Sequence, residues 1–236
     1  MPTLATVLAD MHNDPFAFMR HYRLSIAGGG ANSASGVYTF FYWDQLNNVP
    51  GFTTGIAGLR GKVKNRAVIS FSKRNFDPNP VAANGFFNAH YVSMVDDNVL
   101  GATYYTLPRN GPTSDANPDI MLTSQLSNCT FGIGSPGVGS QLVCHVQPHI
   151  AFDDPNDAQA GRRHLHDTVE AGLLAGGVKS IFHRENENAA TGYGNTDHRA
   201  TIIGLRNGTN WKFYEQTYRD RSAAIGDLAV LEARKL

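Results

Sequence analysis

From Val37 onward the chain alternates short runs of aromatic and β-branched residues with turns rich in Gly, Asn and Pro. Such runs are typical of β-strands, because these side chains fit a pleated, half-buried surface. Asn207-Gly208 is a strong hairpin signal, and Asp97-Asn98 indicates a second hairpin. The pattern predicts strands at 37–43, 67–72, 88–97, 100–107, 120–126, 130–133, 141–146, 178–183, 201–205 and 211–218.

Three segments show helical spacing of apolar residues instead, at 3–20, 155–175 and 223–234. Gly176-Gly177 would end the second of these helices. We therefore expect an α+β protein with a mostly antiparallel β-sandwich core and peripheral helices. Because the chain shows no internal repeat or linker, we expect a single domain over residues 1–236.

Charge and hydropathy exclude several classes of protein. Lys and Arg together number 20, as do Asp and Glu, so the formal net charge is zero, whereas nucleic-acid binders usually carry a basic excess. No apolar stretch approaches the ~18 residues that suggest a membrane span. Met1–Met19 lacks the basic and then apolar pattern of a signal peptide. We expect a soluble protein which, if it leaves its cell, does so without a cleaved leader.

The chain has 2 cysteines, and one of them, Cys129, is followed 16 residues later by His145. The glycine-rich segment Gly132–Gly139 separates them, so the flanking strands should pair, with residues near 129–131 opposite residues near 143–145. A cysteine attacks as the thiolate, and an imidazole can take its proton and later return it to a leaving amine. The spacing predicts a nucleophile and its base in a solvent-reachable cleft.

Acyl transfer also needs donors for the developing oxyanion and a group that orients the base. The backbone amides of Asn128 and Cys129 are candidate donors. Gln147 shares a strand face with His145, and Thr123 lies on the preceding strand, so either side chain is a candidate orienting group.

The remaining cysteine and the other histidines favour structural roles. Cys144 lies beside His145, and strand alternation points it to the opposite face, as expected of a structural thiol. A disulfide between Cys129 and Cys144 is the alternative role for both cysteines. His164 and His166 are an i, i+2 pair that would not share a helix face, and no metal site is expected.

The residues around Cys129 resemble the cysteine glutamine-deamidase toxins, the family of cytotoxic necrotizing factor and Burkholderia lethal factor. Their Leu-Ser-Gly-Cys motif corresponds to Leu126-Ser-Asn-Cys129, and their downstream strand histidine corresponds to His145. A threonine six residues before the cysteine of Burkholderia lethal factor matches Thr123. Asn128 stands where the family has glycine, and asparagine tolerates a sharp-turn backbone better than most other side chains.

The resemblance implies an enzyme: a bacterial toxin or effector, delivered into a host cell, that hydrolytically deamidates a glutamine of a host protein such as a small GTPase or a translation factor. It implies Cys129 as the nucleophile, His145 as acid and base, and Thr123 as a further residue of the catalytic site. It implies no metal and no organic cofactor.

Other functions fit the same residues. A non-catalytic β-sandwich binding module, similar to an adhesin or a lectin, would bury Cys129 as an inert thiol. Another cysteine amidase or peptidase would use the same pair on a different amide. A structural, capsid-like protein would account for the Gly-, Pro- and Asn-rich strands and the neutral charge.

Overall fold

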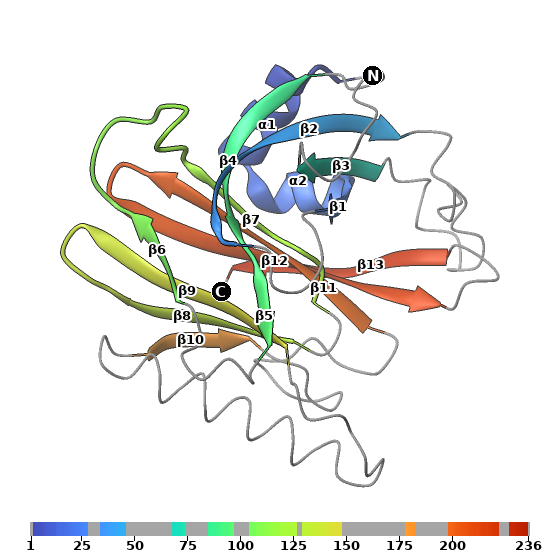
Figure 1. Ribbon diagram of the computed structural model, residues 1–236. Coiled ribbons are helices and arrows are strands. Elements are labelled where there is room, and N and C mark those ends of the chain that lie inside the picture. The colour runs from blue at the N-terminus through green and yellow to red at the C-terminus, as the bar shows by residue number, and fades with distance from the viewer. Residues whose placement is uncertain are drawn as a thin grey trace, which may run out of the picture.

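The computed structural model describes residues 2–27, 34–45, 68–73, 85–96, 104–126, 129–147, 178–182, 198–221 and 227–235 (Figure 1). Two helices, α1 (Leu4–Asn13) and α2 (Pro15–His21), open the chain. An eight-stranded sheet has the order β1 (Arg23–Ala27), β3 (Val68–Lys73), β2 (Gly36–Gln45), β4 (Phe86–Val92), β7 (Ile120–Thr123), β11 (His198–Asn207), β12 (Asn210–Arg221) and β13 (Asp227–Lys235). A five-stranded sheet has the order β10 (Val178–Phe182), β8 (Thr130–Pro136), β9 (Ser140–Gln147) and β5 (Met94–Asp96), and β6 (Tyr105–Pro108) also pairs with β9.

Most neighbouring strands run antiparallel. Parallel pairing occurs between β1 and β3, between β4 and β7, and between β5 and β9. The helices are short and the core is built from strands, which confirms the α+β, β-rich fold class expected from the sequence.

The alternation of side chains along each strand produces three layers. In β4, Phe87 and Tyr91 belong to a core cluster shared with the helices, whereas Val92 belongs to a cluster shared with the smaller sheet. The two faces of the larger sheet therefore bury different partners. The cluster between the sheets includes Val92, Leu107, Met121, Leu126, Cys129, Phe131, Ile133, Val143, Ile202, Trp211 and Phe213. The candidate site lies in this cluster.

The predicted helix over 3–20 is broken into α1 and α2 at Asp14-Pro15. Pro15 has no N–H to continue the first helix, and the residue before a proline avoids helical dihedrals. Asp14 accordingly has φ −144° and ψ 83°, and its carboxylate accepts a hydrogen bond of 2.9 Å from Ala17 N. Asp14 therefore ends one helix and caps the next.

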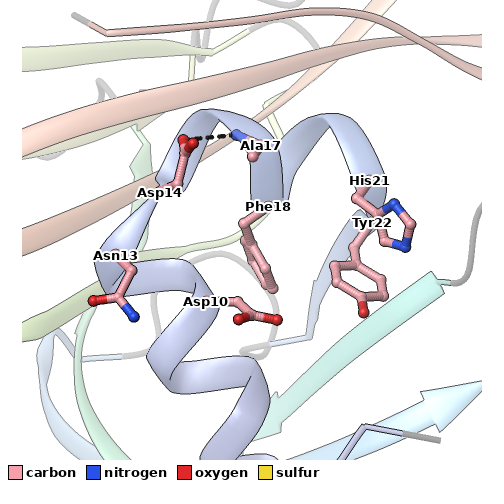
Figure 2. Close-up of a pocket in the computed structure, with 7 residues that line it drawn as sticks. All are labelled: Asp10, Asn13, Asp14, Ala17, Phe18, His21 and Tyr22. Atoms are coloured by element: carbon pink, nitrogen blue, oxygen red, sulfur yellow. Dashed lines mark hydrogen bonds between the residues drawn. The ribbon is translucent and has the colours of Figure 1, made fainter.

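A cavity of about 350 Å³ lies along this helical pair (Figure 2). Its lining residues come from α1, α2 and the link between them, with Tyr22 directly after α2: Asp10, Asn13, Asp14, Ala17, Phe18, His21 and Tyr22. None of them is a candidate catalytic residue.

Of the two hairpins predicted from turn signals, the described residues include one. The Asn207-Gly208 turn joins β11 to β12 as expected, with Gly208 at φ +60°, a conformation that glycine adopts without strain. The hairpin predicted at Asp97-Asn98 lies outside the described residues, and the described strands on either side of it, β5 and β6, both pair with β9. The predicted strand over 88–97 divides into β4 and β5, which belong to different sheets.

The helix predicted over 223–234 is also wrong, since β13 extends from Asp227 to Lys235 and pairs antiparallel with β12. Its apolar spacing resembles a helix, but β12 offers a long row of backbone donors and acceptors, and pairing with it satisfies the backbone of β13. The helix predicted over 155–175 lies outside the described residues.

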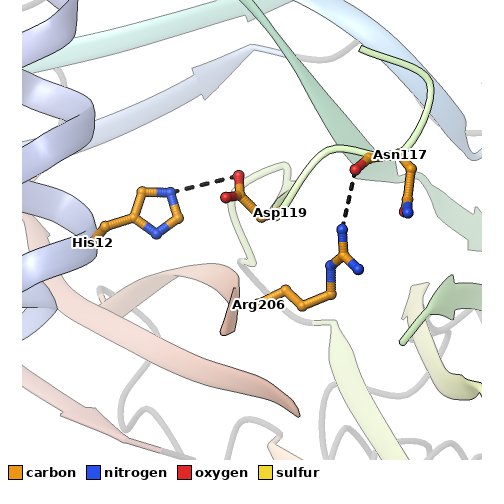
Figure 3. Close-up of polar contacts among 4 residues, drawn as sticks. All are labelled: His12, Asn117, Asp119 and Arg206. Carbon is orange, nitrogen blue, oxygen red and sulfur yellow. Dashed lines mark hydrogen bonds and ion pairs between the residues drawn. The ribbon is translucent and has the colours of Figure 1, made fainter. Parts of the chain in front are cut away.

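Polar contacts connect α1 to the loop before β7 (Figure 3). His12 Nε2 lies 3.6 Å from Asp119 Oδ1, and Arg206 donates hydrogen bonds to the carbonyls of Gly111 and Asn117. The neighbouring His12 ring holds the pKa of the Asp119 carboxyl below its ordinary value of 3.8. The ionised form of Asp119 therefore stabilises the folded state.

We expect Asp119→Asn to lower the free energy of unfolding by about 0.5 kcal/mol near pH 5, a magnitude usual for a partly exposed ion pair. A depressed carboxyl pKa contributes stability above the unfolded-state value, and this contribution disappears as pH falls through the folded-state pKa. Urea denaturation at two pH values measures the difference. Asp115→Asn is the matched control, because it removes a carboxylate from an exposed position in the same loop. A difference from wild type that persists in strong acid would contradict the assignment.

Candidate functional site

Three elements supply the candidate residues. Thr123 ends β7 in the larger sheet, Cys129 directly precedes β8, and His145 lies in β9 of the smaller sheet. All three side chains are buried, with 0%, 1% and 1% of their surfaces exposed. Residues from three segments of the chain thus lie together in the space between the two sheets.

Cys129 and His145 face the same side of the smaller sheet. Phe131 pairs with His145 across the β8–β9 ladder, so Cys129, two residues before Phe131, lies diagonal to the histidine. Cys129 and Phe131 both belong to the cluster between the sheets, as does Val143, two residues before His145. Diagonal residues in an antiparallel pair have Cα atoms ~7–8 Å apart, a separation that side chains can bridge.

The predicted β8–β9 hairpin is confirmed, and residues near 129–131 lie opposite residues near 143–145 as expected. The chain reverses at Gly137–Gly139, the last part of the glycine-rich segment, and the earlier glycines Gly132 and Gly134 lie within β8. Within this ladder Phe131 lies opposite His145.

The hydrogen bonds of Thr123 determine which nitrogen of His145 carries the proton. Thr123 Oγ1 lies 2.8 Å from the carbonyl oxygen of Val92 and 2.6 Å from His145 Nδ1. A carbonyl oxygen only accepts, so the single hydroxyl proton of Thr123 is donated to Val92. Oγ1 must then accept from Nδ1–H. The neutral ring of His145 therefore carries its proton on Nδ1. Its Nε2 has the free lone pair that a general base requires.

His145 Nε2 is buried and has no hydrogen-bond partner among the described residues. Burial lowers the pKa of the imidazole from 6.5 to about 3. The ring is therefore neutral at physiological pH, with its lone pair available for a proton. A buried acceptor without a partner costs stability.

The Cys129 thiol contacts a methionine rather than the imidazole. Its Sγ lies 3.5 Å from Met94 Sδ, and no hydrogen bond between Sγ and His145 is present in the described part of the chain. The sulfur is 1% exposed, so the solvent-reachable cleft expected from the sequence is closed in this structure. The apolar residues that surround it, among them Leu126 and Phe131, belong to the cluster between the sheets.

Cys144 lies on the opposite face of β9, as expected of a structural thiol. It pairs with Gly132 and is fully buried, and burial raises its pKa to about 12. Neither cysteine forms a disulfide, so the bridge considered between Cys129 and Cys144 is absent.

Several candidate groups fall outside the described residues. Asn128, whose backbone amide is a candidate oxyanion donor, is among them, as are His164 and His166. Gln147 ends β9, but its side chain is outside the described part of the structure. Within the described ranges, no group of three or more His, Cys, Asp or Glu side chains is placed to hold a metal ion.

Sequence reasoning missed two participants, Val92 and Met94. Val92 contributes only a backbone carbonyl, which leaves no mark in the side-chain sequence. Met94 reaches the site because β5 pairs in parallel with β9, and parallel pairing between distant segments has no local turn signal.

Comparisons with known proteins give a distant structural likeness. Comparison with protein-family models finds no match, and comparison with curated protein sequences finds none. Among solved structures, the chain is similar to the C-terminal domain of CNFy from Yersinia pseudotuberculosis, with 11% sequence identity and a TM-score of 0.39 over 88% of this chain and 91% of that one. The two helices of the described residues lack the length and apolar character needed to cross a bilayer.

Proposed function

We propose that the protein is a cysteine hydrolase acting on carboxamides, and specifically that it deamidates a glutamine side chain of another protein. The observation that carries the proposal is the hydrogen bonding of Thr123, which leaves the lone pair of His145 on Nε2. Nucleophilic catalysis uses a histidine that is oriented by a third group and lies within reach of a cysteine. His145 is oriented by Thr123 and lies diagonal to Cys129 on the same face, which supports the proposal.

In the proposed reaction, Cys129 passes its proton to His145 Nε2, and the thiolate attacks the carboxamide carbon of glutamine. Donors such as the backbone amides of Asn128 and Cys129 stabilise the oxyanion. The imidazolium returns the proton to the leaving nitrogen as the C–N bond breaks, so ammonia departs and a thioester remains. Nε2 then takes a proton from water, which attacks the thioester. Glutamate is released and the thiol is restored.

Glutamine in a host protein is proposed as the substrate on the strength of the motif Leu126-Ser-Asn-Cys129 and its downstream His145. The same resemblance underlies the proposal of a toxin or effector, a single catalytic domain over 1–236, that acts inside a host cell. A small GTPase or a translation factor is the substrate class that the resemblance suggests. The chemistry needs no metal and no organic cofactor, because the thiol, imidazole and water account for every proton and bond.

The test is peptide mapping of a cell extract before and after incubation with the protein, with ammonia measured in parallel and a chelator present. We expect one or a few glutamines to become glutamates, with an equal amount of ammonia. Conversion that stops when the chelator is added would argue against the thiol mechanism. Absence of any conversion in extracts from several host types would contradict the proposed activity.

The burial of Cys129 favours a second candidate, a β-sandwich binding module without catalysis. In that case the thiol is a core side chain, and its contact with Met94 is ordinary packing. A binding module would be captured on an extract protein and leave the mass of every peptide unchanged. The two functions therefore give different results in the same mapping experiment.

We expect Thr123→Val to reduce the deamidation rate about 10- to 100-fold, because His145 Nδ1–H loses the acceptor that fixes the tautomer. The same variant leaves the carbonyl of Val92 without its donor, and the free energy of unfolding should fall by about 1–3 kcal/mol. Initial rates and urea denaturation measure the two effects. Thr123→Ser keeps the hydroxyl, so its deamidation rate and its free energy of unfolding should both be close to those of wild type. A Thr123→Ser variant as slow as Thr123→Val would show that the hydroxyl is not what matters.

A further inference from the structure

We propose that Met94 is a positioning residue of the site, whose thioether holds Cys129 away from His145 and occupies the place that the substrate carboxamide must take. The proposal rests on the proposed function, since it takes Cys129 as the nucleophile. Its starting point is the contact of 3.5 Å between Cys129 Sγ and Met94 Sδ.

Strand register brings Met94 to this position. Met94 pairs with His145 across the parallel β5–β9 ladder, and Phe131 pairs with His145 across the antiparallel β8–β9 ladder. Paired residues project to the same face, so the three side chains form one row across the smaller sheet. Because Cys129 lies diagonal to His145 on that face, the contact between the two sulfurs spans β9 beside the imidazole.

The contact places Met94 where a substrate would react. Nucleophilic attack requires the reacting carbon ~3–3.5 Å from the attacking atom. Met94 Sδ lies at this distance from Cys129 Sγ. A carboxamide carbon and the thioether cannot both occupy that position. Substrate binding therefore requires the Met94 side chain to move.

The same contact directs the thiol proton away from the base. Sγ donates toward Met94 Sδ, while His145 Nε2 has no partner among the described residues. A thiol is a weak donor and a thioether a weak acceptor, so this contact itself adds little free energy against rotation of Sγ toward the imidazole. Once Met94 withdraws, Sγ and Nε2 are left facing each other on neighbouring strands, and the proton can pass from sulfur to nitrogen.

The surroundings of Met94 allow it to move. Met94 is partly exposed, whereas Thr123, Cys129 and His145 are each at most 1% exposed. It begins β5, a strand from Met94 to Asp96 that lies at the end of the sheet order β10-β8-β9-β5. A short edge strand has few backbone hydrogen bonds to break, and methionine has three rotatable bonds. Of the four side chains of the site, Met94 is therefore the one that solvent or substrate contacts first.

The experiment measures the alkylation rate of Cys129 by iodoacetamide, resolved from Cys144 by peptide mass mapping. Met94→Ala should raise the rate about tenfold or more, a change equivalent to ~1.4 kcal/mol in the barrier. Met94→Leu fills the same space and should stay within about threefold of wild type. Cys144 should remain unmodified in every variant, because it is fully buried on the opposite face of β9.

Met19→Ala is the matched control, since Met19 is a buried methionine of the helical layer in the other core cluster. It should leave the alkylation rate of Cys129 unchanged. A Met94→Ala rate within twofold of wild type, or an equal rise in Met19→Ala, would overturn the proposal. The double variant Met94→Ala/His145→Gln separates this proposal from the proposed function. If its alkylation rate equals that of Met94→Ala at every pH tested, Met94 still blocks access to the thiol. In that case His145 does not activate Cys129, and the proposed function fails.

Discussion

Cys129→Ala is expected to abolish deamidation, with a rate reduced by about 10⁴- to 10⁶-fold, the scale observed when the nucleophile of a hydrolase is removed. Without the sulfur no thioester forms, and the remaining groups can at best polarise the amide. Initial rates of ammonia release on an identified substrate measure the loss. Cys129→Ser should be nearly as slow, because a hydroxyl at this position ionises far less readily than a thiol.

Cys144→Ala is the matched control for this variant. It makes the same chemical change at a residue that is equally buried on a neighbouring strand but faces away from His145. Both substitutions remove one buried sulfur, so both should destabilise the fold to a similar degree. We expect Cys144→Ala to retain activity within about twofold. Equal activity in the two variants would exclude Cys129 as the nucleophile.

His145→Gln is expected to slow deamidation by about 10²- to 10⁴-fold, the usual contribution of a general acid and base. Glutamine fills similar space and can keep a hydrogen bond to Thr123 Oγ1, but it cannot exchange a proton with Cys129. Initial rates under saturating substrate test this directly. A variant that is slow only because it is unfolded would be recognised by circular dichroism.

The same substitution should also change how stability depends on pH. Burial lowers the pKa of His145 from 6.5 to about 3, so the unfolded chain binds a proton between these values and the folded chain does not. The free energy of unfolding therefore falls as pH decreases from about 6.5 to about 3. His145→Gln removes this contribution, and its stability should fall less steeply with acid than that of wild type. His90, whose pKa is lowered to about 4 chiefly by burial, retains its own acid sensitivity in the variant.

The candidate site shows where sequence reasoning succeeds and where it stops. Cys129 and His145 flank a turn signal in one hairpin, and hairpin pairing is a local property of the chain. Thr123 lies in another sheet, and its bond to His145 depends on how the sheets stack. Met94 could not be anticipated at all, because its neighbours in sequence say nothing of the strand it pairs with. The catalytic roles of these residues stay a prediction that the experiments above decide.

The amino-acid sequence by itself determined most of the extended segments and the turn at Gly208, because the runs of aromatic and β-branched residues in β2, β4 and β11 and the backbone freedom of glycine act within a few residues. Only the tertiary structure decided which strands meet. Asp227–Lys235, whose apolar spacing resembles a helix, forms an edge strand, and one predicted strand is divided between two sheets. Met94 contacts the thiol of Cys129. The reason is that backbone pairing and apolar burial between distant segments outweigh local propensities, which are worth only fractions of a kcal/mol per residue, ~0.5 on typical scales.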